Sequence, residues 1–339
     1  MYKVLILSRE GDAARSYLRQ TKGGRAVSLN GEYQFYVNED IDEPDFLFVR
    51  GKAFKNPYTL RVAPQNIFLL TSEPPSVLRY PKGYCRQFAT VLTCQPSLHT
   101  GNNVYVPPVL PWLVGIVESK KGNTVNLTYD DFCAQPDSLP KTKLMSVISS
   151  DKTFTTGHRR RRHFVERLKQ RYGDQIDFFG EGINPFDDKW DVLAPYKYHV
   201  VIENSVEPLY WTEKLSDCYL TDTFPIYCGC PDVDQFFPRE AYEPFSMENF
   251  DKACSIIDSV IARNLYEQSR QARAESKKLV LEKYNIFEII AQACSLGKPE
   301  AQKETITIQP AQRYFNLHNA YVQNLGHLVG NILWKLGIF

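Results

Sequence analysis

Two acidic residues, an amide and a lysine lie close together in the stretch IENSVEPLYWTEKLSDCYLTDTFPIYCG, which covers residues 202–229. Glu203 and Asn204 follow an apolar run, and Glu213 and Lys214 open the next helical segment. Charged groups beside buried segments are costly unless they pair with each other or bind a ligand. A lysine opposes the positive end of a helix dipole, unless an anion binds there as well. The pattern therefore predicts either an anion site or an exposed first-turn ion pair.

A second group of basic residues is the run GHRRRRHF at residues 157–164, which opens a helical segment after an apolar, strand-like run. Helical spacing allows only one or two of the four arginines to face the same way. The alternatives are a solvated basic face and a nucleic-acid or targeting patch. The net charge of +1 and the absence of a nucleic-acid-binding motif disfavour the nucleic-acid interpretation. Two anion signals in the same half of the chain predict a diphosphate site.

A carboxylate in the first half of the chain could also take part in chemistry. Glu73 follows the apolar run NIFLLTS and precedes Pro74 and Pro75, which stiffen the backbone. A carboxylate at the end of a strand, opposite an anion site, is placed to act as a general base. The alternative is a loop acid with no role in chemistry.

These residues lie at the ends of segments that read as buried strands. Short apolar runs alternate with polar connections in both halves of the chain. The strand-like runs cover residues 2–8, 32–37, 45–50, 66–72, 89–94, 144–150, 176–180, 198–203 and 224–229. Helices are expected over residues 12–20, 158–171, 212–221, 247–265 and 266–294, and Thr212 is an expected N-cap. This alternation predicts two mostly parallel sheets, with ligands at the carboxyl ends of their strands.

The composition is that of a globular protein, with 43% hydrophobic and 23% charged residues. The eight cysteines show no Cys-x-x-Cys motif and no Cys/His pair at ligand spacing, so reduced core thiols and no metal site are expected. No apolar run approaches the roughly 18 residues of a membrane span, and the start does not read as a signal peptide. The expected location is therefore the cytoplasm.

The 339 residues are enough for two medium-sized domains, and a polar connection over residues 115–143 separates them. We expect a first domain over residues 1–140 and a second over residues 141–298. Residues 299–339 are expected to form an amphipathic helical tail, with an apolar face made by Tyr321, Leu325, Leu328, Ile332 and Leu336. The tail either packs back on the domains, or contacts a partner or the inner face of the membrane.

The stretch that includes residues 202–229 resembles the donor-binding signature of glycosyltransferase family 10, the α1,3/α1,4-fucosyltransferases. That signature runs Glu-Asn, a short spacer, Tyr-x-Thr-Glu-Lys, and then a Pro-[Val/Ile]-x-x-Gly strand. The matching positions are Glu203, Asn204, Tyr210, Thr212, Glu213, Lys214, Pro225 and Gly229. Arg161, three residues before Phe164, and the segment SEPPS that contains Glu73 are also similar to family segments. The similarity is strong over residues 144–238 and weak in the first domain.

The resemblance implies a GT-B-like α/β fold, in which two Rossmann-like domains face a cleft and a helical tail follows. It makes residues 1–140 the acceptor side and residues 141–298 the donor-binding domain. It also implies inversion at the sugar, GDP-fucose as the donor, and neither a cofactor nor an obligatory metal. The acceptor would be an oligosaccharide or a glycolipid, such as a lipopolysaccharide precursor. Fucose would be linked α1,3 or α1,4 to GlcNAc or Glc by a soluble enzyme of the bacterial type.

Roles for single residues follow from the same resemblance. Glu73 would be the general base, and Arg161 and Lys214 would stabilise the leaving diphosphate. The residues expected to bind GDP-fucose are Arg161, Glu203, Asn204, Tyr210, Glu213 and Lys214. Glu203 has an alternative role, which is to hold a neighbouring loop.

Three other functions remain open at this stage. The chain could transfer a different nucleotide-activated sugar. It could be a non-catalytic module for a nucleotide sugar or a glycan, which would keep Arg161 and Lys214 but would not need Glu73. It could also bind nucleic acid through residues 159–162, with an affinity that falls steeply with salt.

Overall fold

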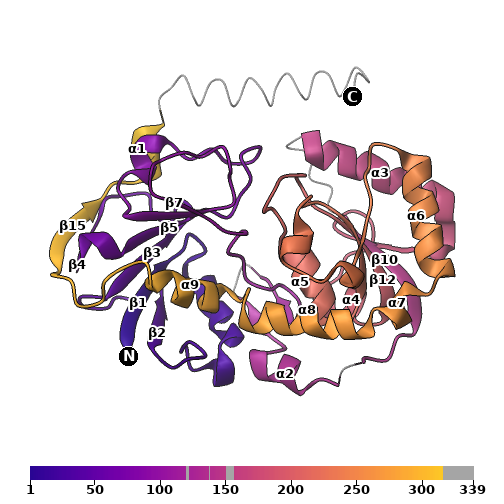
Figure 1. Ribbon diagram of the computed structural model, residues 1–339, viewed down its shortest axis with the longest axis horizontal. Coiled ribbons are helices and arrows are strands. Elements are labelled where there is room, and N and C mark those ends of the chain that lie inside the picture. The colour runs from indigo at the N-terminus through magenta and orange to yellow at the C-terminus, as the bar shows by residue number, and fades with distance from the viewer. Residues whose placement is uncertain (120–121, 137, 150–155, 316–339) are drawn as a thin grey trace. The chain divides into compact units, whose positions relative to one another are not determined.

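The computed structural model describes residues 1–119, 122–136, 138–149 and 156–315. Packing divides these residues into two compact units. The first unit contains Met1–Pro111, Ile116–Ala134 and the described residues from Leu281 onward. The second contains Trp112–Gly115 and Gln135–Val280. Each unit is built on its own parallel sheet, as the sequence predicted (Figure 1).

The first unit has a six-stranded sheet in the order β2-β1-β3-β5-β6-β7, and all its neighbouring strands are parallel. The strands are β1 Tyr2–Leu7, β2 Tyr33–Val37, β3 Phe46–Arg50, β5 Ile67–Leu70, β6 Thr90–Thr93 and β7 Asn103–Tyr105. The central strands are continuously apolar because both of their faces are covered. Phe46 and Phe48 of β3 pack in one core with residues of α9 (Ile286–Cys294), and Leu47 and Val49 pack in another core that includes Tyr84.

The end of the described chain differs from the helical tail expected over residues 299–339. Residues 304–308 form strand β15 (Glu304–Ile308), which pairs antiparallel with β4 (Tyr58–Val62) in the first unit. Ile308, which is 1% exposed, packs in a core of that unit. The predicted apolar helical face at residues 321–336 lies outside the described residues.

The second unit has a five-stranded parallel sheet in the order β11-β10-β12-β13-β14. Its strands are β10 Lys143–Ile148, β11 Asp177–Phe179, β12 Tyr196–Ile202, β13 Phe224–Cys228 and β14 Glu243–Pro244. Helices α3 (Thr156–Tyr172) and α6 (Phe250–Ala262) contribute Phe164, Leu168 and Ile257 to the core of this sheet. Two shorter helices, α4 (Lys189–Leu193) and α5 (Glu213–Leu220), follow β11 and β12 along the chain.

The helix expected over residues 266–294 is broken into α7 (Leu265–Gln268), α8 (Arg270–Glu282) and α9. Asn285 causes the last break, because its backbone is extended and its side chain accepts a hydrogen bond from the N–H of Phe287 at 3.0 Å. The same side chain donates to the carbonyl of Gln20 at 2.7 Å, within the first unit. Residues 281–298, which the sequence assigned to the second domain, therefore pack with the first unit.

The remaining elements are short. They are α1 Lys82–Cys85, α2 Tyr129–Ala134, β8 Ile116–Val117, β9 Thr124–Val125, and the 3-10 helices η1 Gly11–Gln20, η2 Lys22–Gly24, η3 Pro64–Asn66, η4 Gly173–Gln175, η5 Val233–Gln235, η6 Arg239–Ala241 and η7 Ala311–Tyr314. The segment expected as an α-helix over residues 12–20 is thus a 3-10 helix.

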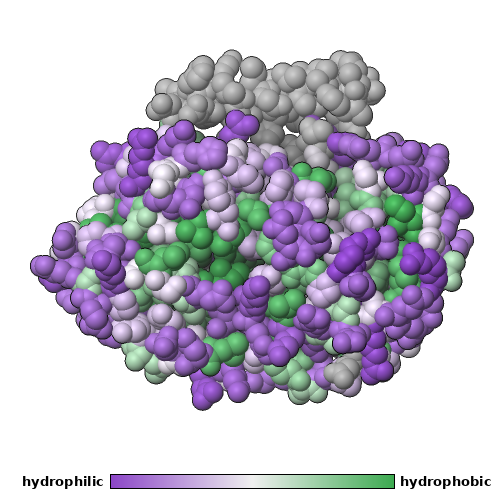
Figure 2. Space-filling view, viewed as in Figure 1, coloured by the Kyte–Doolittle hydropathy of each residue, from purple (hydrophilic) through white to green (hydrophobic). Residues whose placement is uncertain are grey.

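All eight cysteines are free, and seven of them are buried, which confirms the prediction of reduced core thiols. Hydrophilic residues cover much of the face seen in Figure 2, and hydrophobic residues show between them. None of the helices in the described part of the chain combines the length and apolar character that crossing a bilayer requires.

Candidate functional site

Glu203 comes directly after β12 and holds the start of α5. Its side chain is enclosed, with 1% of the residue exposed. The carboxylate accepts hydrogen bonds from the backbone N–H of Thr212 at 2.9 Å and from the Thr212 hydroxyl at 2.8 Å. Thr212 is the N-cap of α5, as predicted, and its hydroxyl accepts from the N–H of Lys214 at 3.4 Å. The contacts of Glu203 are therefore those of an internal support for the loop and the helix.

Gly229 leaves the space that Glu203 occupies. A Cβ at this position would lie 2.5 Å from Cγ of Glu203 and 2.4 Å from the hydroxyl oxygen of Tyr227. Any larger residue would have to displace one of these two buried side chains. The glycine that follows β13 is thus needed for packing next to the site.

Lys214 lies in the first turn of α5 between two carboxylates. Its ammonium is 3.3 Å from Oε2 of Glu203, 3.2 Å from Oε1 of Glu213 and 3.0 Å from the Thr212 hydroxyl. Burial alone would lower the pKa of Lys214, but Glu203 and Glu213 raise it above its ordinary value. Burial would likewise raise the pKa of Glu213, but Lys214 and Lys189 lower it to about 2. Glu213 and Lys214 are therefore charged at neutral pH, whereas burial raises the pKa of Glu203 above its ordinary value. Neither member of the first-turn pair is exposed, so it is not the exposed pair that the sequence left open.

The arginine run of α3 divides into inward and outward positions. Arg159 and Arg161 are 3% and 5% exposed, whereas Arg160 and Arg162 lie on the surface. Arg162 pairs with Glu166, one turn further along the helix, at 2.9 Å. Two of the four arginines are therefore enclosed, which agrees with the expectation that a helix cannot turn the whole run to one side.

Arg161 reaches the end of β12. Its Nη1 donates a hydrogen bond to the side-chain oxygen of Asn204 at 2.5 Å. Burial lowers the pKa of the guanidinium, and the nearby Glu203, Tyr210 and Glu213 oppose that effect. Tyr210 is itself 2% exposed, so it belongs to the same enclosed group.

The second unit thus brings together all the candidate residues that the sequence placed there: Arg161, Glu203, Asn204, Tyr210, Glu213 and Lys214. Arg161 lies close enough to Lys214 for its positive charge to act to lower the pKa of Lys214. Two partly desolvated cations at the start of a helix are suited to hold an anion. The group lies at the carboxyl end of β12, where ligands bind in parallel α/β sheets.

Glu73 belongs to the first unit and follows the carboxyl end of β5. It is partly exposed, and its backbone carbonyl accepts a hydrogen bond from the side-chain amide of Gln95 at 2.7 Å. Glu10, at the end of β1 in the same sheet, forms an ion pair with Arg50 at 3.0 Å.

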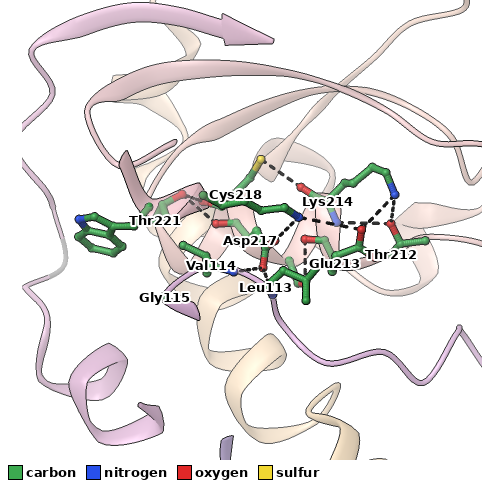
Figure 3. A network of polar contacts seen from close by, with 12 residues as sticks. Leu113, Val114, Gly115, Thr212, Glu213, Lys214, Asp217, Cys218 and Thr221 are labelled. Atoms are coloured by element: carbon green, nitrogen blue, oxygen red, sulfur yellow. Dashed lines mark hydrogen bonds and ion pairs between the residues drawn. The ribbon is translucent and has the colours of Figure 1, made fainter. Parts of the chain in front are cut away.

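Sequence reasoning missed two charged residues in the group around α5. Lys189, the first residue of α4, is 2.8 Å from Asp217 and 4.0 Å from Glu213. Asp217 is buried on α5 and accepts hydrogen bonds from the N–H groups of Leu113 and Val114 at 3.1 and 3.2 Å (Figure 3). The i, i+4 spacing of Glu213 and Asp217 was the available signal, because it places two acids on one helical face.

The described residues contain no group of three or more His, Cys, Asp and Glu side chains that could hold a metal ion.

The comparisons with known proteins point to one family. Residues 139–271 match the model of "Glycosyltransferase family 10 (fucosyltransferase) C-term". A stretch of 71 residues is 37% identical to the alpha-(1,3)-fucosyltransferase FucT of Helicobacter pylori, and covers 21% of this chain. That match spans only 15% of the length of the Helicobacter protein.

Two solved structures are similar in fold. A crystal structure of an alpha1,3-fucosyltransferase with GDP shares 17% identity, with a TM-score of 0.49 over 84% of this chain and 90% of the other. The Anabaena protein Alr3699/HepE in complex with UDP and glucose shares 7% identity, with a TM-score of 0.50 over 87% of this chain and 100% of the other.

The two parallel α/β units and the similarity to the Anabaena protein confirm the predicted α/β fold of the GT-B type. The family match covers β10 through α7, so it includes Arg161, Asn204 and Lys214. This segment therefore matches the model of glycosyltransferase family 10, and the match covers less than half of the chain.

Proposed function

We propose that this protein is an inverting glycosyltransferase that transfers fucose from GDP-fucose to a hydroxyl group of an acceptor glycan. The observation that carries the proposal is the proximity of two cations, the buried Arg161 and the half-buried Lys214, at the end of β12 and the start of α5. These residues lie inside the segment that matches family 10. A diphosphate has the charge and the oxygen acceptors that such a pair requires.

In the proposed reaction an acceptor oxygen attacks C1 of fucose from the face opposite GDP. The bond between C1 and the phosphate oxygen breaks, and GDP leaves with the bonding electrons. Arg161 and Lys214 stabilise the negative charge that grows on the diphosphate. Asn204 orients Arg161 through their hydrogen bond, and Glu213 and Tyr210 are proposed to contact the nucleoside. Glu203 is proposed to act indirectly, because its contacts hold Thr212 and Lys214.

Glu73 is proposed to accept the proton of the attacking hydroxyl. It is a carboxylate at the carboxyl end of a parallel strand, and it is partly exposed. A general base in this role contributes a rate factor of about 10²–10⁴. The proposal for Glu73 is supported by its position in the segment SEPPS, which is similar to a family segment.

The acceptor is proposed to be an oligosaccharide or a glycolipid, with fucose linked α1,3 or α1,4 to GlcNAc or Glc. The name of the Helicobacter relative, an alpha-(1,3)-fucosyltransferase, supports the first of these linkages. A cytoplasmic location, with contact to the inner face of the membrane through the last residues, stays a prediction because residues 316–339 lie outside the described chain.

The donor is tested by thermal unfolding of the purified protein with GDP, GDP-fucose, UDP and UDP-sugars, each with and without a chelator of divalent metals. Ligands that bind the folded state raise the melting temperature. We expect stabilisation by GDP and GDP-fucose that persists with the chelator, and a smaller effect of UDP compounds. Stabilisation by a UDP-sugar alone would indicate a transferase of another sugar, and stabilisation only in the presence of metal would contradict the proposed charge roles of Arg161 and Lys214.

A further inference from the structure

A row of alternating charges lies along α5, and Figure 3 labels three of its members, Asp217, Glu213 and Lys214. Asp217 is 2.8 Å from Lys189, Lys189 is 4.0 Å from Glu213, and Glu213 is 3.2 Å from Lys214. Glu203 completes the row, at 3.3 Å from Lys214. Each interior member of the row therefore lies between two opposite charges.

The row fixes Lys189 firmly. One oxygen of Asp217 accepts from the backbone of Leu113 and Val114, and the other accepts from Lys189. The side chain of Asp217 is 0% exposed and that of Lys189 is 17% exposed. An ammonium with a buried partner of this kind has little freedom to leave it.

The position of Lys189 changes the electrostatic potential at the Lys214 ammonium, and so the affinity of that ammonium for an anion. Lys214 lies between two acidic side chains, Glu203 and Glu213, and Glu213 is ionised at neutral pH. Lys189 supplies a second cation to Glu213, so that part of the negative charge beside Lys214 is offset. Without Lys189, the electrostatic potential at Lys214 would disfavour an incoming anion.

We propose that Lys189 is a positioning residue for the diphosphate site: it shares Glu213 with Lys214 and so leaves the Lys214 ammonium able to bind phosphate oxygens. The inference rests on the proposed function, because it requires that Lys214 meets a nucleoside diphosphate. Lys189 acts through Glu213 and Lys214 and has no direct role in the chemistry.

The test compares Lys189→Met with the wild-type protein by calorimetric titration with guanosine, GMP and GDP. Guanosine is neutral, so its affinity should change little. The loss should grow with phosphate charge and reach about tenfold for GDP, which corresponds to about 1.4 kcal/mol. Lys189→Arg should restore most of the GDP affinity. The matched control is Lys197→Met, which removes a lysine paired with Glu267 at 3.0 Å elsewhere in the same unit and should bind all three ligands normally.

Lys189→Met leaves Asp217 buried without its cation, so the variant could lose stability. The double variant Lys189→Met/Asp217→Asn removes both charges and keeps an oxygen for the N–H groups of Leu113 and Val114. It should fold and still bind GDP more weakly than the wild type, with guanosine affinity retained. Equal losses for guanosine, GMP and GDP would show a purely structural role and overturn the proposal, as would unchanged GDP affinity in both variants. If the wild-type protein itself does not bind GDP, the proposed function fails, and this inference fails with it.

Discussion

The direction of each side chain in the basic run decides which arginines can bind a ligand. Arg161 is buried and bonded to Asn204, whereas Arg162 is exposed and paired with Glu166. Arg161→Ala should therefore raise the dissociation constant of GDP at least about tenfold, the lower end of what a hydrogen bond to a charged group contributes.

Arg162→Ala is the matched control for this prediction, because it removes an adjacent arginine of the same helix. It should leave GDP affinity unchanged within about twofold, since an exposed i, i+4 pair contributes little. Calorimetric titration of both variants measures the two constants. Similar losses in both variants would indicate a diffuse polyanion surface instead of a diphosphate clamp.

Much of the candidate site could be predicted at this scale, and the reason is local. Glu203, Asn204, Thr212 and Lys214 fall within one strand-loop-helix segment, so their proximity follows from the order of residues. Lys189 could not be predicted in the same way, because its contact with Asp217 depends on how α4 packs beside α5. Sequence patterns show which residues share a helical face, but they do not show which neighbouring helix meets it.

At the scale of elements, the central strand β12 contains a buried histidine. His199 is 4% exposed, and its Nδ1 is 2.7 Å from the hydroxyl oxygen of Ser146 on β10. The Ser146 hydroxyl donates to the carbonyl of Val192 at 2.9 Å, so His199 must supply the proton of its own bond as a neutral donor. Burial, helped by Lys189, lowers the pKa of His199 to about 3.

This shift predicts how the stability of the second unit depends on pH. Because the folded pKa lies below the ordinary value of 6.5, the unfolded chain binds the proton first, and stability falls as the pH drops below that value. The free energy of unfolding should decrease by about 2 kcal/mol between pH 7 and pH 5. The described tryptophans, Trp112, Trp190 and Trp211, all lie in the second unit, so urea unfolding followed by tryptophan fluorescence reports on it.

A matched pair of variants isolates this effect. His199→Asn keeps a donor for Ser146 but does not titrate, so its unfolding free energy should change less between pH 7 and pH 5. His163→Gln, on the exposed side of α3, should keep the wild-type pH dependence. An identical pH dependence in His199→Asn and in the wild type would show that His199 is not the group responsible.

The strands and their parallel pairing were predictable, whereas some helix ends and one strand pair were not. Continuous apolar runs identified the central strands because burial on both faces leaves a strong signal. The pairing of β15 with β4 joins segments that are far apart in the sequence. Thr59 and Thr307, whose hydroxyl groups form a hydrogen bond, are separated by 248 positions. The break before α9 lies at Asn285. The side chain of this residue caps α9 and also donates a hydrogen bond to the distant carbonyl of Gln20, which local sequence does not reveal.

At the scale of the whole molecule, the two units contain different parts of the proposed chemistry. Arg161 and Lys214 belong to the second unit, and Glu73 belongs to the first. The proposed donor site can therefore be changed without touching the proposed base, and the reverse is also true. This separation allows donor binding and proton removal to be measured as independent quantities.

The central claim is that the protein transfers fucose from GDP-fucose, with Glu73 as the base. The most direct measurement is the rate of fucose transfer from GDP-fucose to a set of oligosaccharide acceptors, made together with the dissociation constant of GDP, for the wild type and for Glu73→Gln. Glutamine keeps the size of the side chain and removes only its basicity. We predict transfer by the wild type, and a rate lower by about 10²–10⁴ in Glu73→Gln with GDP affinity unchanged. Near-normal transfer by Glu73→Gln would show that another acid is the base. The claim of an enzyme would be contradicted, in favour of a binding module, if the wild-type protein bound GDP-fucose but transferred fucose to none of the acceptors.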